Sequence, residues 1–267
     1  MKNGNRLPGA PGKSGNPFGN GLMGRLFERQ KNLYVSPPEN VPLVPLQELA
    51  SYLISVSDEQ WGRYAFSRDP IDRRFTREER STLTRQALDC GEHYAAEALA
   101  HGYAKPEALA EHLGVRVRYP FRPSGALEGS RVLFAQYITP NKIDIYTDCT
   151  QRADEAFAAP ELRALLGEVR TADVLLCHEL FHYFEHRDRK TIFTETARKD
   201  IPIFGCIPNR ARILCLGEIA AMRFAQRLLD LPYSPYVYDV LLTHLYTEQA
   251  ACNLCAEIRS LALENTP

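Results

Sequence analysis

The sequence predicts an α+β fold in which a small sheet of about three strands packs against a helical bundle. Three observations support this class. Helical apolar periodicity dominates the chain after residue 76, a short middle stretch alternates with the period of two typical of strands, and a helical run near residue 175 carries paired histidines. With 267 residues, 45% of them hydrophobic, the chain is long enough to bury a sizeable core.

Start and stop signals mark several of the expected helices. Thr76-Arg77-Glu78-Glu79 matches a capping box and predicts a helix that runs to about residue 101, where Gly102 is a plausible stop. Pro106 opens a shorter helix that reaches about residue 113. Other helices are expected over residues 46–55, 160–169, 171–187, 212–230, 236–245 and 247–262.

The strands are expected between these helices. Residues 115–119 alternate apolar and polar side chains, as a half-buried strand does. Residues 132–138 and 142–146 form two more candidate strands, and Thr139-Pro140-Asn141 is a turn sequence between them. The pattern therefore predicts a hairpin over residues 132–146 together with one separate strand.

Composition divides the chain into three parts. Residues 1–45 form a basic tail rich in proline and glycine that is expected to be flexible. Residues 46–75 form an N-terminal extension that is partly helical, and its single tryptophan, Trp61, has no assigned role. Residues 76–267 carry the stronger patterns and are expected to form the main domain.

Charge, apolar run length and cysteine number limit the partners and the location. A net charge of −1 gives no global argument for binding nucleic acid, and we interpret the basic tail as a solvated segment. No apolar run approaches the roughly 18 residues needed to span a bilayer, so no membrane partner is expected. The seven cysteines are an odd number scattered along the chain, which favours a reducing, cytoplasmic setting.

The pattern that carries chemistry is His178-Glu179-Leu180-Phe181-His182. Four residues turn an α-helix by roughly 400°, so both imidazoles stand on nearly the same face, one turn apart. Two imidazoles in this arrangement can bind one Zn²⁺ ion, and the adjacent Glu179 is placed to take a proton from water at that ion. Because apolar residues flank the motif, its three polar side chains need partners inside the protein.

The third ligand is less determined by spacing. One alternative is Asp188, ten residues after His178, as in metzincin-like sites, but the glycine that such a turn needs is replaced by Glu185. His186 lies about 80° round the helix from His178 and two turns away, too far to share its ion. We favour Glu218, a lone acid on an apolar helix whose small neighbours would allow close approach to the metal helix.

Two weaker patterns are set aside. Residues 109–115 read like the first half of a DNA-binding helix-turn-helix, but the next residues alternate as a strand, so no direct contact with nucleic acid is expected. Cys252-Asn253-Leu254-Cys255 could form a thiolate zinc site with Cys206 and Cys215, but the pair lies in a helical pattern and is expected to pack as small hydrophobes.

The histidine motif and the Glu218 helix, taken in order, resemble the ImmA/IrrE family of zinc metallo-endopeptidases. The resemblance rests on His178-Glu179-x-x-His182 followed by Glu218-x-x-Ala221-x-x-Phe224-Ala225-x-x-Leu228-Leu229. Residues 108–117 are similar to the helix and strand that open that domain, residues 137–146 to its paired strands, and residues 245–251 to the start of its closing helix. The similar region spans roughly residues 76–260.

The resemblance implies a zincin-like metallopeptidase domain over residues 76–267. It implies a Zn²⁺ cofactor held by His178, His182 and Glu218, with Glu179 as the catalytic base. Family members cleave transcriptional repressors of the Xre type, so the implied protein substrate is a helix-turn-helix repressor. The alternative is a non-catalytic zinc-binding sensor or protein-interaction module on the same scaffold.

A peptidase also needs a binding site for the substrate backbone and a donor for the oxyanion. The hairpin over residues 132–146 could supply an edge strand that binds substrate as an added strand. The oxyanion formed during hydrolysis would need a donor, for which Tyr137, Tyr183 and His186 are unranked candidates.

Overall fold

The sheet of the computed structural model contains the three strands expected from the sequence. Residues 41–121, 134–201 and 209–263 are described. Strands β1 (Arg116–Arg118), β2 (Ala135–Ile138) and β3 (Lys142–Ile145) lie in the order β1-β3-β2. Strand β1 is parallel to β3, and β2 is antiparallel to β3 with Tyr137 opposite Ile143. The first residues of the expected hairpin, 132 and 133, fall outside the described ranges.

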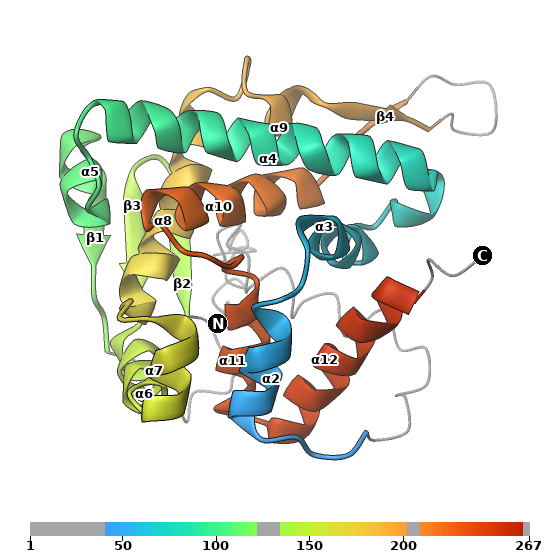
Figure 1. Cartoon of the computed structure of the whole chain (residues 1–267). Coiled ribbons are helices and arrows are strands. Elements are labelled where there is room, and N and C mark those ends of the chain that lie inside the picture. The colour runs from blue at the N-terminus through green and yellow to red at the C-terminus, as the bar shows by residue number, and fades with distance from the viewer. Residues whose placement is uncertain (1–40, 122–133, 202–208, 264–267) are drawn as a thin grey trace, which may run out of the picture.

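Most of the rest of the structure is helical, so the α+β class is confirmed (Figure 1). The helices are α2 (Leu46–Leu53), α3 (Asp58–Ser67), α4 (Arg77–Ala100), α5 (Pro106–His112), α6 (Thr147–Phe157), α7 (Pro160–Leu166), α8 (Thr171–Arg187), α9 (Phe193–Thr196), α10 (Cys215–Leu228), α11 (Val237–His244) and α12 (Glu248–Leu263). A 3₁₀ turn (Asp72–Arg74) and the short strand pair β4 (Arg198–Asp200) and β5 (Arg210–Arg212) complete the described elements.

Local signals in the sequence set the ends of helix α4. The Thr76 side chain accepts a hydrogen bond from the Glu79 backbone N–H, and the Glu79 carboxylate accepts one from the Thr76 backbone N–H. This is the expected capping box, which satisfies two donors at the helix start. After the helix end, Gly102 has a φ of +83°, a left-handed conformation that glycine adopts without a steric penalty.

Helix α10 packs closely against both α4 and α8 (Figure 1). At Gly91 of α4, a Cβ atom would lie 2.2 Å from the backbone oxygen of Ala220, so only glycine allows this approach of the two helices. On the other side, the ring of Phe224 lies 5.9 Å from Phe181 and 5.6 Å from Phe184, centroid to centroid. These contacts fix α10, and with it Glu218, relative to the histidine helix.

Residues before Thr76 contribute to the same core. Helix α3 contacts α4, α10 and α12 and buries Trp61, Tyr64 and Phe66. The Trp61 ring stacks on Tyr236 at 5.3 Å between centroids, and Tyr64 packs edge-on against Tyr236 at 5.7 Å. The segment from residue 46 therefore packs beside α10 and α11, the helices that flank the candidate site.

Two sequence expectations can be compared with the elements directly. Helix α5 is followed by strand β1 rather than by a second helix, so residues 106–118 do not form a helix-turn-helix. Cys252 and Cys255 are buried within α12, while Cys206 lies outside the described residues. Among the helices that the structure describes, none has the length and apolar character needed to cross a membrane.

Candidate metal centre

Helix α8 places the histidine motif inside the protein. It spans residues 171–187, as the sequence predicts, and its exposed fractions are 4% for His178, 3% for Glu179 and 5% for His182. Polar side chains buried to this degree need hydrogen-bond or metal partners, because their loss of water is otherwise uncompensated.

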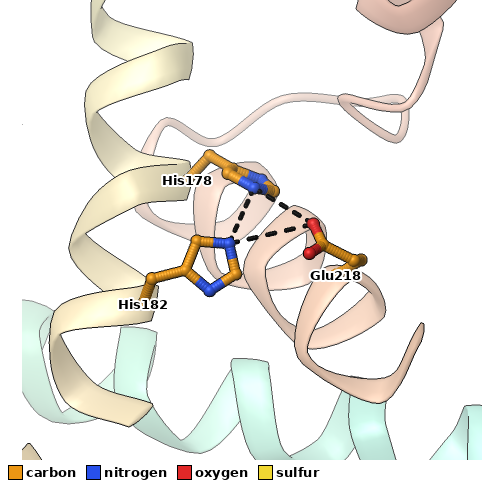
Figure 2. Close-up of side chains that lie close together, drawn as sticks. All are labelled: His178, His182 and Glu218. Atoms are coloured by element: carbon orange, nitrogen blue, oxygen red, sulfur yellow. Dashed lines mark hydrogen bonds and ion pairs between the residues drawn. The ribbon is translucent and has the colours of Figure 1, made fainter. Parts of the chain in front are cut away.

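Three of the expected site residues converge on one point (Figure 2). The Nε2 atoms of His178 and His182 lie 3.1 Å apart, and the Glu218 Oε2 atom lies 3.4 Å from the first and 3.8 Å from the second. Ligands of a tetrahedral zinc ion are about 3.3–3.6 Å from one another, given bond lengths of about 2.0–2.2 Å. Within the described ranges, no other group of three or more His, Cys, Asp or Glu side chains is close enough to share an ion.

A fourth residue, Glu185, holds the second histidine in place. Its Oε2 atom lies 2.6 Å from Nδ1 of His182, one turn earlier on α8. The proton of the imidazole is therefore on Nδ1, which leaves the Nε2 lone pair for a metal ion. This role of Glu185 is not among the sequence predictions, although its i, i+3 spacing from His182 is a signal for such a contact.

The contact between His182 and Glu185 shifts the pKa values of both residues. Burial alone would lower the pKa of His182, but the nearby Glu218 carboxylate and the Glu185 hydrogen bond raise it above its usual value. Burial alone would raise the pKa of Glu185, but the His182 contact lowers it, with a smaller contribution from the nearby Thr194 side chain. Glu185 is thus held ionised as the acceptor for His182.

The same carboxylate explains why α10 carries a glycine next to Glu218. A Cβ atom at Gly217 would lie 2.5 Å from the Glu185 Oε1 atom. A separation of 2.5 Å between a Cβ atom and an oxygen is far below an ordinary contact. Glu185 can occupy this space because residue 217 has no side chain. Helices α10 and α8 therefore approach each other closely, as the small residues of α10 predict. At Gly217, the space between them holds the Glu185 carboxylate.

Glu179 lines a small cavity next to His178. The cavity has a volume of about 20 Å³, enough for about one water molecule. The Glu179 Oε2 atom is buried and has no hydrogen-bond partner within the part of the chain that the structure describes. A buried carboxylate with an unsatisfied oxygen, next to a metal-ligand group, fits a base that acts on water.

The other ligand alternatives lie elsewhere. Asp188 follows α8 and pairs with Arg187 at 2.6 Å, and it accepts a hydrogen bond of 2.8 Å from the Tyr94 hydroxyl. His186 packs near Tyr137, with the ring centroids 6.1 Å apart, and it is not part of the convergent group. The structure therefore brings together the favoured set and not these alternatives.

Two of the three candidate oxyanion donors have other partners. The Tyr137 hydroxyl donates to the backbone oxygen of Pro140, and the Tyr183 hydroxyl donates to that of Leu113 at 3.3 Å. Both hydroxyls therefore donate to backbone oxygens of the protein itself. The oxyanion donor stays unassigned among the candidates from the sequence.

The structure adds one acidic residue that sequence reasoning missed. Asp239 of α11 is 4% exposed and lines the same cavity as His178 and Glu179. Its Oδ2 atom accepts a hydrogen bond of 3.1 Å from the Tyr64 hydroxyl. Burial raises the pKa of Asp239 to about 7, with a further contribution from Glu218. The sequence carries little signal for this position, because the hydrogen bond from Tyr64 joins residues 175 positions apart.

No family model matches the chain, and no match is found among curated proteins or solved structures. The case for a metal centre therefore rests on the geometry of the three convergent side chains. Two imidazole nitrogens and one carboxylate oxygen form a group that could bind a metal ion.

Proposed function

We propose that the chain is a zinc-dependent endopeptidase of the ImmA/IrrE type, with a zincin-like domain over residues 76–267. The observation that carries the proposal is the convergence of His178, His182 and Glu218 from two helices, beside a buried Glu179. Each of the four side chains has the chemistry that its position in such a peptidase requires.

Zinc is the ion that best suits the donor set. Catalytic zinc sites have three protein ligands, commonly two histidines and a carboxylate, and keep a further position open. Here the three donor atoms are 3.1–3.8 Å apart, and a water-sized cavity lies beside His178. The Glu185 carboxylate orients His182 in the way that outer carboxylates orient metal-binding histidines.

The chemistry proposed for the site is hydrolysis of a peptide bond. When bound, zinc supplies a Lewis acid that polarises the scissile carbonyl group and lowers the pKa of water. Glu179 takes a proton from the attacking water and passes it to the nitrogen of the leaving amine. The buried Oε2 atom of Glu179, which has no hydrogen-bond partner among the described residues, supports this role.

The proposed substrate is a protein chain, with an Xre-type helix-turn-helix repressor as the candidate from the resemblance. Strand β2 is an edge of the three-stranded sheet, packs against α8, and contributes Ala135 to the cavity wall. An extended peptide could add to such an edge through backbone hydrogen bonds and pass close to the metal group.

Zinc content and hydrolysis, measured together, test this proposal. Wild-type protein should bind about one zinc ion per chain and cleave a candidate repressor. Glu179→Gln should keep the zinc and lose about 10²–10⁴-fold in rate, because the base is gone while all three ligands remain. Glu155→Gln, at an exposed position of α6, is the matched control and should change neither quantity.

The results separate the peptidase from its rival. Zinc binding without cleavage of any protein or peptide would favour the non-catalytic sensor or interaction module. Cleavage by Glu179→Gln at the wild-type rate would show that Glu179 is not the base. A wild-type protein that binds no zinc would refute the peptidase and the zinc-binding sensor and would leave the protein-interaction module.

A further inference from the structure

A polar pocket lies between helices α3 and α4, on residues that the proposed hydrolysis does not use. Its volume is about 360 Å³, within the range of roughly 300–1,000 Å³ that small-molecule sites occupy. Its walls come from α3, the 3₁₀ turn, α4 and the C-terminal end of α12, and eight of its nine lining residues are polar or charged. It shares no residue with the metal group or with the cavity beside His178.

Two of the three arginines that line this pocket are held in place by neighbouring acceptors. Arg63 of α3 donates hydrogen bonds to Glu59 at 2.6 Å and to the backbone oxygen of Leu261 at 3.0 Å. Arg80 of α4 donates to the carboxylate of Asp72 at 2.7 Å and to its backbone oxygen at 2.9 Å. A guanidinium group has five N–H donors. Both arginines are therefore oriented by the protein and keep further donors for a ligand.

The lining residues of the pocket carry an excess of positive charge. Glu59 and Asp72 balance two of the arginines, but Arg77, the first residue of α4, forms no ion pair within the described part of the chain. Three cations against two anions leave a net charge of +1. The Arg63 side chain is only 14% exposed, so an anion beside it would be screened less by water than at an open surface.

The donors are arranged for an anion with several oxygens. Arg77, Arg80, Ser81 and Thr84 follow one another at the i, i+3 and i+4 spacing of one helix face, and Arg63 lies on the other helix. A terminal phosphate group has three acceptor oxygens and a charge between −1.5 and −2 near neutral pH, roughly twice that of one carboxylate. Arginine binds such groups through two parallel hydrogen bonds.

We propose that this pocket binds a small molecule through a phosphate monoester group, which Arg63, Arg77 and Arg80 contact. A volume of about 360 Å³ exceeds what a phosphate ion fills, so the ligand also has an organic part. The site is independent of the proposed hydrolysis. The bound molecule would link α3, which belongs to the N-terminal extension, to α4, the first helix of the expected main domain.

Calorimetry on the full-length chain tests the proposal with four probes at constant ionic strength. Ribose 5-phosphate carries the phosphate group and an organic part, inorganic phosphate lacks the organic part, and ribose lacks the phosphate. Citrate is an anion that offers only carboxylates, so it separates recognition of phosphate from general attraction of negative charge. We expect ribose 5-phosphate to bind with a Kd below about 1 mM, citrate and inorganic phosphate to bind more weakly, and ribose not to bind.

Three variants locate the binding and fix the sign of its charge. Arg77→Gln should weaken ribose 5-phosphate binding about tenfold or more, because it removes a charged hydrogen-bond donor from an exposed position. Arg85→Gln, exposed on the same helix but outside the pocket, is the matched control and should stay within about twofold of wild type. Glu59→Gln should bind as tightly as wild type or more tightly, since it removes a negative charge from the pocket.

Several results would overturn the proposal. They are no binding of ribose 5-phosphate at about 10 mM, tighter binding of citrate than of ribose 5-phosphate, and unchanged binding in Arg77→Gln. Equal losses in Arg77→Gln and Arg85→Gln would show a general effect of charge and no site. Weaker binding in Glu59→Gln would indicate a ligand with a cationic group instead. The three variants should keep the zinc content and cleavage of wild type, so this inference and the peptidase are tested separately.

Discussion

Gly217→Ala should weaken zinc binding although residue 217 does not contact the ion. An added Cβ would lie 2.5 Å from the Glu185 Oε1 atom and 3.0 Å from Oε2. To reach an ordinary contact near 3.4 Å, the carboxylate must retreat by about 0.9 Å. Its hydrogen bond to His182, now 2.6 Å long, would then approach 3.5 Å and be lost.

The expected loss of zinc affinity is about 10–100-fold, the usual effect of removing a residue that orients a metal-binding histidine. This corresponds to about 1.4–2.7 kcal/mol. The metal-free protein should change little in stability, since alanine favours a helix interior over glycine by about 1 kcal/mol. Zinc affinity is measured by competition with a chelator, and stability by denaturant unfolding of the metal-free chain.

Gly91→Ala is the matched comparison. Its Cβ would lie 2.2 Å from the backbone oxygen of Ala220, which cannot rotate away, so the cost should be about 1–3 kcal/mol of stability. Zinc affinity of the folded fraction should fall less than in Gly217→Ala, because Glu185 keeps its hydrogen bond to His182. Unchanged zinc affinity in Gly217→Ala would refute the argument that Glu185 orients His182 from its present position.

The remaining predictions concern the third ligand and the capping box. Glu218→Ala should lose zinc or bind it far more weakly, whereas Asp188→Ala, which removes a partner of Arg187 and Tyr94, should keep it; equal metal content in both variants would contradict the ligand assignment. Thr76→Ala should lower the free energy of unfolding by about 1 kcal/mol, measured in urea, because it removes the side-chain acceptor at the start of α4; an unchanged midpoint would show that the cap is dispensable.

The parts of the structure that could be predicted have strong local signals. Helix α8 has a long apolar pattern, α4 has a capping box, and β1 lies in a stretch that alternates apolar and polar side chains. The convergence of Glu218 on the histidines was also expected, because a lone acid among small residues on an apolar helix needs a buried partner.

The elements that were missed lack such signals or have weak ones. Helix α6 begins without a side-chain cap at Tyr146, and α9 is only four residues long. Strands β4 and β5 are three residues each and consist almost entirely of charged side chains, so no alternation is visible. Helix α3 does have a start signal in the sequence. Ser57 caps it by accepting a hydrogen bond from the backbone N–H of Gln60.

The stacking of Trp61 on Tyr236 gives the molecule an internal optical probe. Trp61 is the single tryptophan of the chain, is 2% exposed, and lies against the ring of a tyrosine whose pKa is raised by burial and by the Glu218 carboxylate. Its emission therefore comes from one defined place beside the metal group. Neutralisation of the Glu218 charge by a bound cation would alter the electric field at this aromatic pair, so metal uptake can be followed by fluorescence without an attached dye.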